Sequence, residues 1–209
     1  RNMSSAASDV YKRQGGDCFI PSDRIEAGTY LAAATLTNGS ITVNKVDPNR
    51  LENILSKLRL CGADIKTTNQ SVSIEMKTDI NPVDIQTQPF PGFPTDMQAQ
   101  FTVINALSKG SSVITENVFE NRFMHVQELV RMGCNISIQG KNAFIQGVKA
   151  ITGAQVMATD LRASACLILA GLCAEGETIV DRIYHIDRGY ERIEEKLSYL
   201  GANIVRLPR

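Results

Sequence analysis

The sequence predicts an α/β domain in which apolar helices lie inside and sheets lie around them, the reverse of a TIM barrel. Two observations support this fold class. Three stretches of the 209-residue chain align with one another as repeated units, and each unit begins with a segment that is apolar nearly all round as a helix. A helix without a polar face is buried on every side, so three such helices bury best against one another.

The three units share the spacing of an aspartate, a glycine, an arginine and a second glycine. The first glycine follows the aspartate by 14 or 16 positions, and the second glycine follows the arginine by 11 to 13 positions. The equivalent residues are Asp23, Asp96 and Asp160, then Gly39, Gly110 and Gly176, then Arg50, Arg122 and Arg188, and finally Gly62, Gly133 and Gly201. We therefore expect one domain over residues 15–209, with units at about 22–80, 93–150 and 157–209.

Each unit predicts a buried helix that starts at an aspartate N-cap and is followed by a short β-branched strand. The expected helices are Ala27–Leu36, Ala99–Leu107 and Ala163–Cys173. The expected strands are Ser40–Val43, Ser112–Thr115 and Thr178–Val180.

A second, amphipathic helix is expected to start at Asn49, Asn121 or Asp187 and to end at a glycine. Strand pairs follow it in the first two units, at Ala63–Lys66 with Val72–Glu75 and at Asn135–Ile138 with Ala143–Ile145. The third unit reaches Pro208 without a partner strand, so we expect a strand to be missing there.

The composition excludes several classes of function. The chain has 22 basic and 22 acidic residues, so no net charge attracts it to nucleic acid or to an anionic membrane. No apolar run approaches the ~20 residues of a membrane span, and no secretory signal is present. The five cysteines, Cys18, Cys61, Cys134, Cys166 and Cys173, form no CxxC pair and fit small buried residues of a reducing cytoplasm. We expect a cytoplasmic protein without metal or cofactor.

The first fourteen residues, RNMSSAASDVYKRQ, are polar and aperiodic and do not match the pattern that follows. We interpret residues 1–14 as a non-native or disordered tail and leave them out of the fold prediction.

Several long stretches between Ser22 and Arg206 resemble the enolpyruvyl transferases, and among them the branch that uses UDP-N-acetylglucosamine. These stretches are DRIEAGTYL, FPTDMQAQFT, VFENRFMHVQELVRMG, GAQVMATDLRAS and DRIYHIDRGYERIEEKL. The resemblance implies the family's inside-out α/β barrel and matches its second domain. It also implies that the chain is a C-terminal fragment, inactive alone, without the first domain that carries a Lys-Asn pair and a mobile cysteine loop.

The activity that the resemblance implies is transfer of the enolpyruvyl group of phosphoenolpyruvate to the 3′-hydroxyl of UDP-N-acetylglucosamine, with release of phosphate, for peptidoglycan synthesis. Its partners are these two substrates and the missing first domain. The alternatives are the sister enzymes that act on shikimate 3-phosphate and a non-catalytic remnant. The FPTDMQAQ and VFENRFMHV stretches favour the nucleotide sugar.

The same resemblance implies the site residues. Asp96 matches the family aspartate that contacts the sugar and is the candidate base for its hydroxyl, although the repeat alone favours a helix N-cap. Arg162 and Arg188 match catalytic arginines that bind anionic groups, and Arg122 matches a substrate-binding arginine. Val118 matches a backbone contact to the nucleotide sugar, and Arg24 is a weaker binding candidate.

The remaining charged residues are expected to be structural. Arg50 occupies the same repeat position as Arg122 and Arg188 but matches no family role. His125 and His185 are tempting acid–base groups, but we interpret both as hydrogen-bonded structural histidines.

Overall fold

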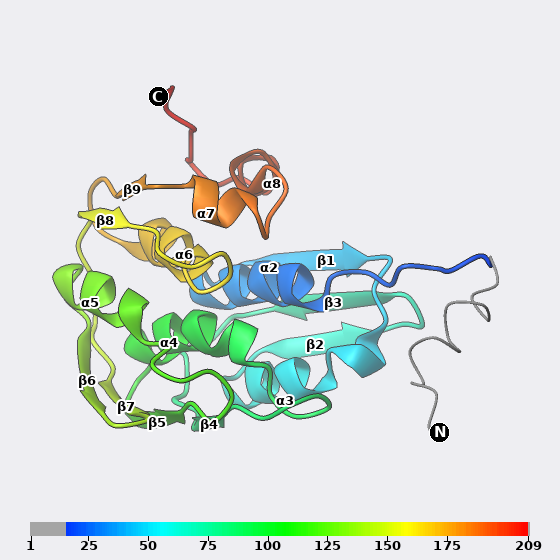
Figure 1. Ribbon diagram of the computed structural model, residues 1–209, viewed down its shortest axis with the longest axis horizontal. Coiled ribbons are helices and arrows are strands. Elements are labelled where there is room, and N and C mark those ends of the chain that lie inside the picture. The colour runs from blue at the N-terminus through cyan, green and yellow to red at the C-terminus, as the bar shows by residue number, and fades with distance from the viewer. Residues whose placement is uncertain (1–15, 209) are drawn as a thin grey trace, which may run out of the picture.

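The computed structural model describes residues 16–208, so the tail expected at residues 1–14 lies outside the described residues. Three helices form the middle of this part of the chain, with the strands at its periphery (Figure 1). They are α2 (Arg24–Leu36), α4 (Gln98–Ala106) and α6 (Ala165–Cys173). All of α4 is buried, as are most of α2 and the first two-thirds of α6, and the three helices contact one another pairwise. The prediction of three buried helices is confirmed.

Polar side chains inside these helices join them to their neighbours. Asn105 of α4 donates to the carbonyl of Val83 and accepts from its amide, both at 2.9 Å. Nε2 of Gln100 donates to the hydroxyls of Thr29 at 3.1 Å and Tyr190 at 3.2 Å. Since a buried polar group is costly without a partner, these bonds fix how the helices align.

Three sheets surround the helices. Strands β1 (Ser40–Asn44), β3 (Ser71–Glu75) and β2 (Asp64–Thr67) form an antiparallel sheet in that order. Strands β4 (Ile85–Gln86), β5 (Ser111–Thr115), β7 (Asn142–Gln146) and β6 (Asn135–Gln139) form the second sheet, in which only β4 and β5 are parallel. Strands β8 (Gln155–Met157) and β9 (Ile179–Asp181) form a parallel pair. Residues 202–208, which follow the second glycine of the third unit, form no strand.

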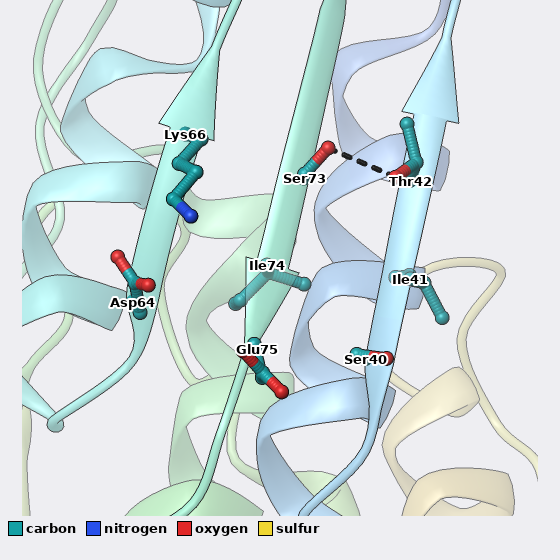
Figure 2. A pocket seen from close by; sticks show the side chains of 8 residues that line it. All are labelled: Ser40, Ile41, Thr42, Asp64, Lys66, Ser73, Ile74 and Glu75. Atoms are coloured by element: carbon teal, nitrogen blue, oxygen red, sulfur yellow. Dashed lines mark hydrogen bonds between the residues drawn. The ribbon is translucent and has the colours of Figure 1, made fainter.

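The first sheet shows why these sequences form strands. Ile41 and Ile74 pair across β1 and β3, and Ile74 is almost completely buried. Polar side chains alternate with them and line a shallow hollow on the other face, where the hydroxyls of Thr42 and Ser73 lie 2.9 Å apart (Figure 2). This alternation is typical of a sheet that packs on a core with one face. No candidate site residue lines the hollow.

The amphipathic helices exist, but they start later than the sequence predicted. They are α3 (Glu52–Leu60), α5 (Met124–Arg131) and α8 (Ile193–Tyr199). Asn49 lies instead in the 3₁₀ turn η1 (Pro48–Arg50), and Asp187 ends the short helix α7 (Tyr184–Asp187). Asn121 has a left-handed φ of 59°, which a right-handed helix cannot include.

The break between α7 and α8 has a clear cause. Arg192 adopts a left-handed φ of 45°, and the ring of Tyr190 is 1% exposed, packed inside the domain. The chain therefore turns inward at Tyr190 before α8 can begin. Arg188 consequently lies at the C-terminal end of α7 and not, as predicted, at the start of the second helix.

The cysteines are all free in the described part of the chain. Cys61, Cys134 and Cys166 are buried and Cys173 is half-buried, which confirms the interpretation of these four as small core residues. Cys18 is exposed, so the interpretation is wrong there, because the segment before α2 packs on no core. Between residues 16 and 208, no helix is long and apolar enough to cross a membrane.

Candidate functional site

One arginine bridges two of the three repeated aspartates. Arg122, in the loop before α5, donates from Nη1 to Oδ1 of Asp96 at 2.6 Å and from Nη2 to Oδ1 of Asp160 at 3.2 Å. Its side chain is only 8% exposed, and a buried charge requires such partners. Burial alone would lower the pKa of Arg122, but the bonds to the two carboxylates raise it above its usual value. The structure thus brings together three residues that are far apart in sequence.

Asp96 does not cap a helix. It lies inside the 3₁₀ turn η2 (Thr95–Met97), whose N-cap is Pro94, and neither η2 nor α4 has a side-chain cap. Asp23 behaves as the repeat predicts, since its carboxylate accepts from the amides of Ile25 and Glu26 at the start of α2. The N-cap interpretation of Asp96 is therefore wrong: its carboxylate is occupied by Arg122.

Asp160 stabilises the turn that leads into α6. Its Oδ1 accepts from the amides of Arg162 at 2.7 Å and Ala163 at 2.6 Å, in addition to the bond from Arg122. Burial alone would raise the pKa of Asp160, but these backbone bonds and the guanidinium of Arg122 lower it below its usual value. Asp160 therefore stays negatively charged and fixes the backbone at Arg162.

Arg162 is held on three sides. Its Nη2 pairs with Asp23, its Nη1 donates to the carbonyl of Gly189 at 2.7 Å, and its guanidinium carbon lies 5.1 Å from the centre of the Tyr190 ring. Burial would raise the pKa of Asp23, but the bond from Arg162 lowers it below its usual value. An anionic ligand of Arg162 must therefore share or displace the carboxylate of Asp23.

Arg188 and Arg24 are the more accessible candidate arginines. Arg188 is exposed and makes no ion pair or side-chain hydrogen bond among residues 16–208. Arg24 is half-buried at the start of α2 and lies over the ring of Phe90, 4.9 Å from its centre. Neither is joined to the Asp96–Arg122 pair, but Arg188 precedes Gly189, the residue whose carbonyl binds Arg162.

Val118 lies in an exposed loop between β5 and α5 and is 44% exposed. Its amide donates to Oε1 of Glu116 at 2.9 Å, and Glu116 is buried. Sequence reasoning missed Glu116. In the sequence, Glu116 is a carboxylate directly after a predicted strand. Charged residues in such positions are usually exposed to water, so the sequence did not indicate that this one is buried.

The two histidines differ from their prediction and from each other. His125 is 2% exposed, and neither ring nitrogen has a hydrogen-bond partner among the described residues. Burial lowers the pKa of His125 to about 4. The hydrogen bonds predicted for His125 are therefore absent within residues 16–208. The ring of His185 lies 4.3 Å from that of Tyr184, outside the network of Arg122.

This arrangement supports proton transfer and anion binding. The side chain of Asp96 is 41% exposed, and only its Oδ1 is bonded within the described chain, so Oδ2 can accept a proton from a hydroxyl. Arg188 supplies an accessible cation one residue before Gly189, whose carbonyl accepts from Arg162. Within residues 16–208, no group of three or more His, Cys, Asp or Glu side chains is arranged to hold a metal ion.

Comparisons with known proteins agree on one family. A family model described as EPSP synthase (3-phosphoshikimate 1-carboxyvinyltransferase) matches residues 8–197. Proteins named UDP-N-acetylglucosamine 1-carboxyvinyltransferase are similar over 199 residues, with 56% identity for one from Klebsiella pneumoniae subsp. pneumoniae and 53% for one from Shewanella sp. (strain ANA-3). The match covers 95% of this chain and 48% of each relative. The chain therefore spans about half the length of the curated relatives it matches.

Solved structures show the same fold. The enolpyruvyl transferase NikO from Streptomyces tendae superposes with a TM-score of 0.81 at 26% identity, over 90% of this chain and 45% of that one. EPSP synthase from Acinetobacter baumannii superposes with a TM-score of 0.61 at 21% identity, over 79% of this chain and 40% of that one, which is a likeness of fold alone.

Proposed function

The chain belongs to the EPSP synthase family, and on that premise we propose that it supplies one half of the active site of a UDP-N-acetylglucosamine enolpyruvyl transferase. The reaction joins the 3′-hydroxyl oxygen of the nucleotide sugar to C2 of phosphoenolpyruvate. The hydroxyl loses its proton, the methylene carbon gains one and later returns it, and the bond between C2 and the phosphate oxygen breaks. This is a step of peptidoglycan precursor synthesis.

The observation that carries the proposal is the state of Asp96. Its Oδ1 is fixed by Arg122 at 2.6 Å, while the side chain remains 41% exposed. A base must be held in one orientation and still reach the proton that it removes. We assign Asp96 the proton of the 3′-hydroxyl, and we assign Arg122 the task of orienting Asp96.

The arginines are proposed to bind the anionic groups of the substrates in two ways. Arg188 has no partner in the described chain, so it can bind a phosphate or carboxylate without breaking an existing contact. Arg162 binds an anion in exchange for Asp23. Val118 contributes its backbone to the nucleotide sugar, and Arg24, whose guanidinium lies over the ring of Phe90, is a further residue that can bind an anionic group.

The sister activity on shikimate 3-phosphate is the second candidate, because the matching family model carries that description. Identity of 53–56% to proteins named for UDP-N-acetylglucosamine supports the nucleotide sugar, compared with 21% to an EPSP synthase. A non-catalytic role is proposed only for the chain by itself, since the first domain supplies the proton donor for the methylene carbon.

We propose further that residues 15–209 form the second domain of the family's inside-out α/β barrel, with units at about 22–80, 93–150 and 157–209. The three buried helices and their separate sheets support this division. A cytoplasmic location is consistent with the free thiols of the described cysteines, which a reducing compartment preserves.

The experiment mixes this chain with the first domain of the Klebsiella pneumoniae relative and measures phosphate release from phosphoenolpyruvate. We expect release with UDP-N-acetylglucosamine and none with shikimate 3-phosphate, and none with the chain alone. Preference for shikimate 3-phosphate supports the sister activity instead. Absence of release with both acceptors contradicts the proposal.

A further inference from the structure

Glu116 is a buried carboxylate, 5% exposed, that collects four hydrogen bonds. Its Oε1 accepts from the hydroxyl of Thr87 at 2.6 Å and from the amides of Val118 at 2.9 Å and Phe119 at 3.0 Å. Its Oε2 accepts from the hydroxyl of Thr95 at 2.8 Å. No cation pairs with it among residues 16–208, so neutral donors alone replace the water that this carboxylate loses on burial.

These bonds connect three segments that are separate in sequence. Thr87 follows β4, Thr95 begins η2, and Val118 and Phe119 form the exposed loop after β5. The two amide bonds are local, to residues two and three positions ahead, and a simple turn would contain them. The two threonine bonds span 29 and 21 positions, and a simple turn does not require them.

The bond to Thr95 continues directly into the candidate site. Oγ1 of Thr95 donates to Glu116 and accepts from Nη1 of Arg122 at 3.2 Å, and the same Nη1 donates to Asp96. Because the hydroxyl hydrogen of Thr95 is committed to Glu116, a lone pair of Oγ1 is left facing Arg122. Glu116 therefore orients the hydroxyl of Thr95 so that it accepts from Arg122, the residue that binds Asp96.

The bond to Thr87 supports the loop from its other side. Oγ1 of Thr87 donates to Glu116 and accepts from the amide of Asn117 at 2.8 Å, and the side-chain amide of Asn117 donates to the carbonyl of Thr87 at 3.3 Å. Asn117, Val118 and Phe119 are thus all tied, directly or through Thr87, to one carboxylate. An exposed loop with few apolar contacts would otherwise be mobile.

We propose that Glu116 is a positioning residue for the nucleotide-sugar half of the site: it presents the backbone at Val118 and Phe119 to the substrate and aligns the Arg122–Asp96 pair through Thr95. This inference rests on the proposed function. Glu116 touches neither substrate nor reacting atoms; it acts through the loop and through Thr95.

The test compares Glu116→Gln with the wild-type chain, each mixed with the first domain of the Klebsiella pneumoniae relative. The glutamine keeps the size of the side chain, but it has one acceptor oxygen instead of two and no charge. With its oxygen on the donors of Oε1, its Nε2 cannot accept the hydroxyl hydrogen of Thr95, and the neutral oxygen binds the amides of Val118 and Phe119 less strongly. We expect the KM for UDP-N-acetylglucosamine to rise by ~10-fold or more, with a smaller change in the KM for phosphoenolpyruvate. Glu177→Gln, an exposed glutamate without a side-chain partner in the described chain, is the matched control and should change neither value.

A second pair of variants isolates the link to Arg122 and does not depend on the folding of Glu116→Gln. Thr95→Val removes the hydroxyl at nearly constant shape and should lower kcat, whereas Thr95→Ser retains the hydroxyl and should restore it. Equal kcat in the valine and serine variants overturns the link. If Glu116 and Thr95 were only structural, their variants would lose stability without a selective rise in the KM for the nucleotide sugar.

Amide hydrogen exchange distinguishes failure of this inference from failure of the proposed function. In the 209-residue chain, the amides of Val118 and Phe119 should exchange faster in Glu116→Gln than in the wild type, while those of α4 are unchanged. Unchanged exchange at the two loop amides, or wild-type KM values in an active mixture, overturns the positioning role. An inactive wild-type mixture contradicts the proposed function itself.

Discussion

Arg122 and Asp96 are joined by a hydrogen bond of 2.6 Å between Nη1 and Oδ1, and the arginine is almost fully buried while the aspartate is not. The pair therefore has a fixed inner member and an accessible outer member. The second contact of Arg122, to Asp160, connects it to the turn before α6. This arrangement fits the role proposed for Asp96, a base that is oriented from inside the protein and is accessible from outside.

Replacing Arg122 with lysine should destabilise the chain. A single ammonium group cannot reproduce the fork that reaches Asp96, Asp160 and Thr95 at once, and one carboxylate loses its partner. We expect a loss of about 1–3 kcal/mol in the free energy of unfolding, measured with urea. The control is Arg50→Lys, at the same repeat position but exposed. Equal stability of the two variants would contradict the bridging role of Arg122.

Replacing Arg188 with alanine should leave stability unchanged and reduce transfer. The side chain is exposed and unpaired within the described residues, so the free energy of unfolding should change by less than ~0.5 kcal/mol. Phosphate release with the first domain present should fall by ~10-fold or more, because an accessible cation for an anionic substrate is lost. Arg50→Ala is the matched control and should retain full activity. A fall of equal size in Arg50→Ala would remove Arg188 from the site.

His125 should make the chain less stable as the pH falls. The unfolded chain binds a proton at this residue near pH 6.5, whereas in the folded chain burial lowers the pKa of His125 to about 4. The free energy of unfolding therefore keeps its full value above pH 6.5, where the ring is neutral in both states, and it decreases as the pH falls toward 4. At 1.36 kcal/mol per pKa unit, the loss is roughly 3 kcal/mol, with Asp160 and Arg122 acting on the ring in opposite directions.

The variant His125→Leu tests this pH dependence. It removes the titrating ring, whose two nitrogens have no partner in the described chain, so stability at pH 7 should be equal or higher. Urea unfolding of wild type and variant at several pH values between 7 and 4 gives the difference directly. If the free energies of unfolding of wild type and variant changed with pH in parallel over this range, His125 would not titrate as described.

Much of the fold follows from local pattern, but the site does not. Helices such as α4 are visible in the sequence because no polar face interrupts them, and β1 is visible from its β-branched residues. The start of the second helices could not be predicted, because a left-handed residue such as Asn121 or Arg192 has no reliable signature when it is not glycine. The internal repeat also predicted Arg188 at the start of the second helix of the third unit. It lies before that helix instead, because the chain turns inward to bury the ring of Tyr190.

The ion pairs depend on tertiary structure. Arg122 is 26 residues from Asp96 and 38 from Asp160, and Arg162 is 139 residues from Asp23. The repeat offered all three aspartates as helix caps, and only packing of the buried helices reveals that Asp96 is bonded to an arginine instead. Resemblance to a family singled out Asp96, Arg122 and Arg162 individually, whereas Glu116 became visible only through its four donors.

The most direct test of the central assignment is the rate of phosphate release by Asp96→Asn, measured with the first domain, phosphoenolpyruvate and UDP-N-acetylglucosamine. Asparagine keeps an oxygen for Arg122, so the variant should fold, but its amide is not a base. The rate should fall by ~10²–10⁴-fold, the usual contribution of a general base. A wild-type rate in the folded variant would contradict the assignment of Asp96 as the group that takes the hydroxyl proton.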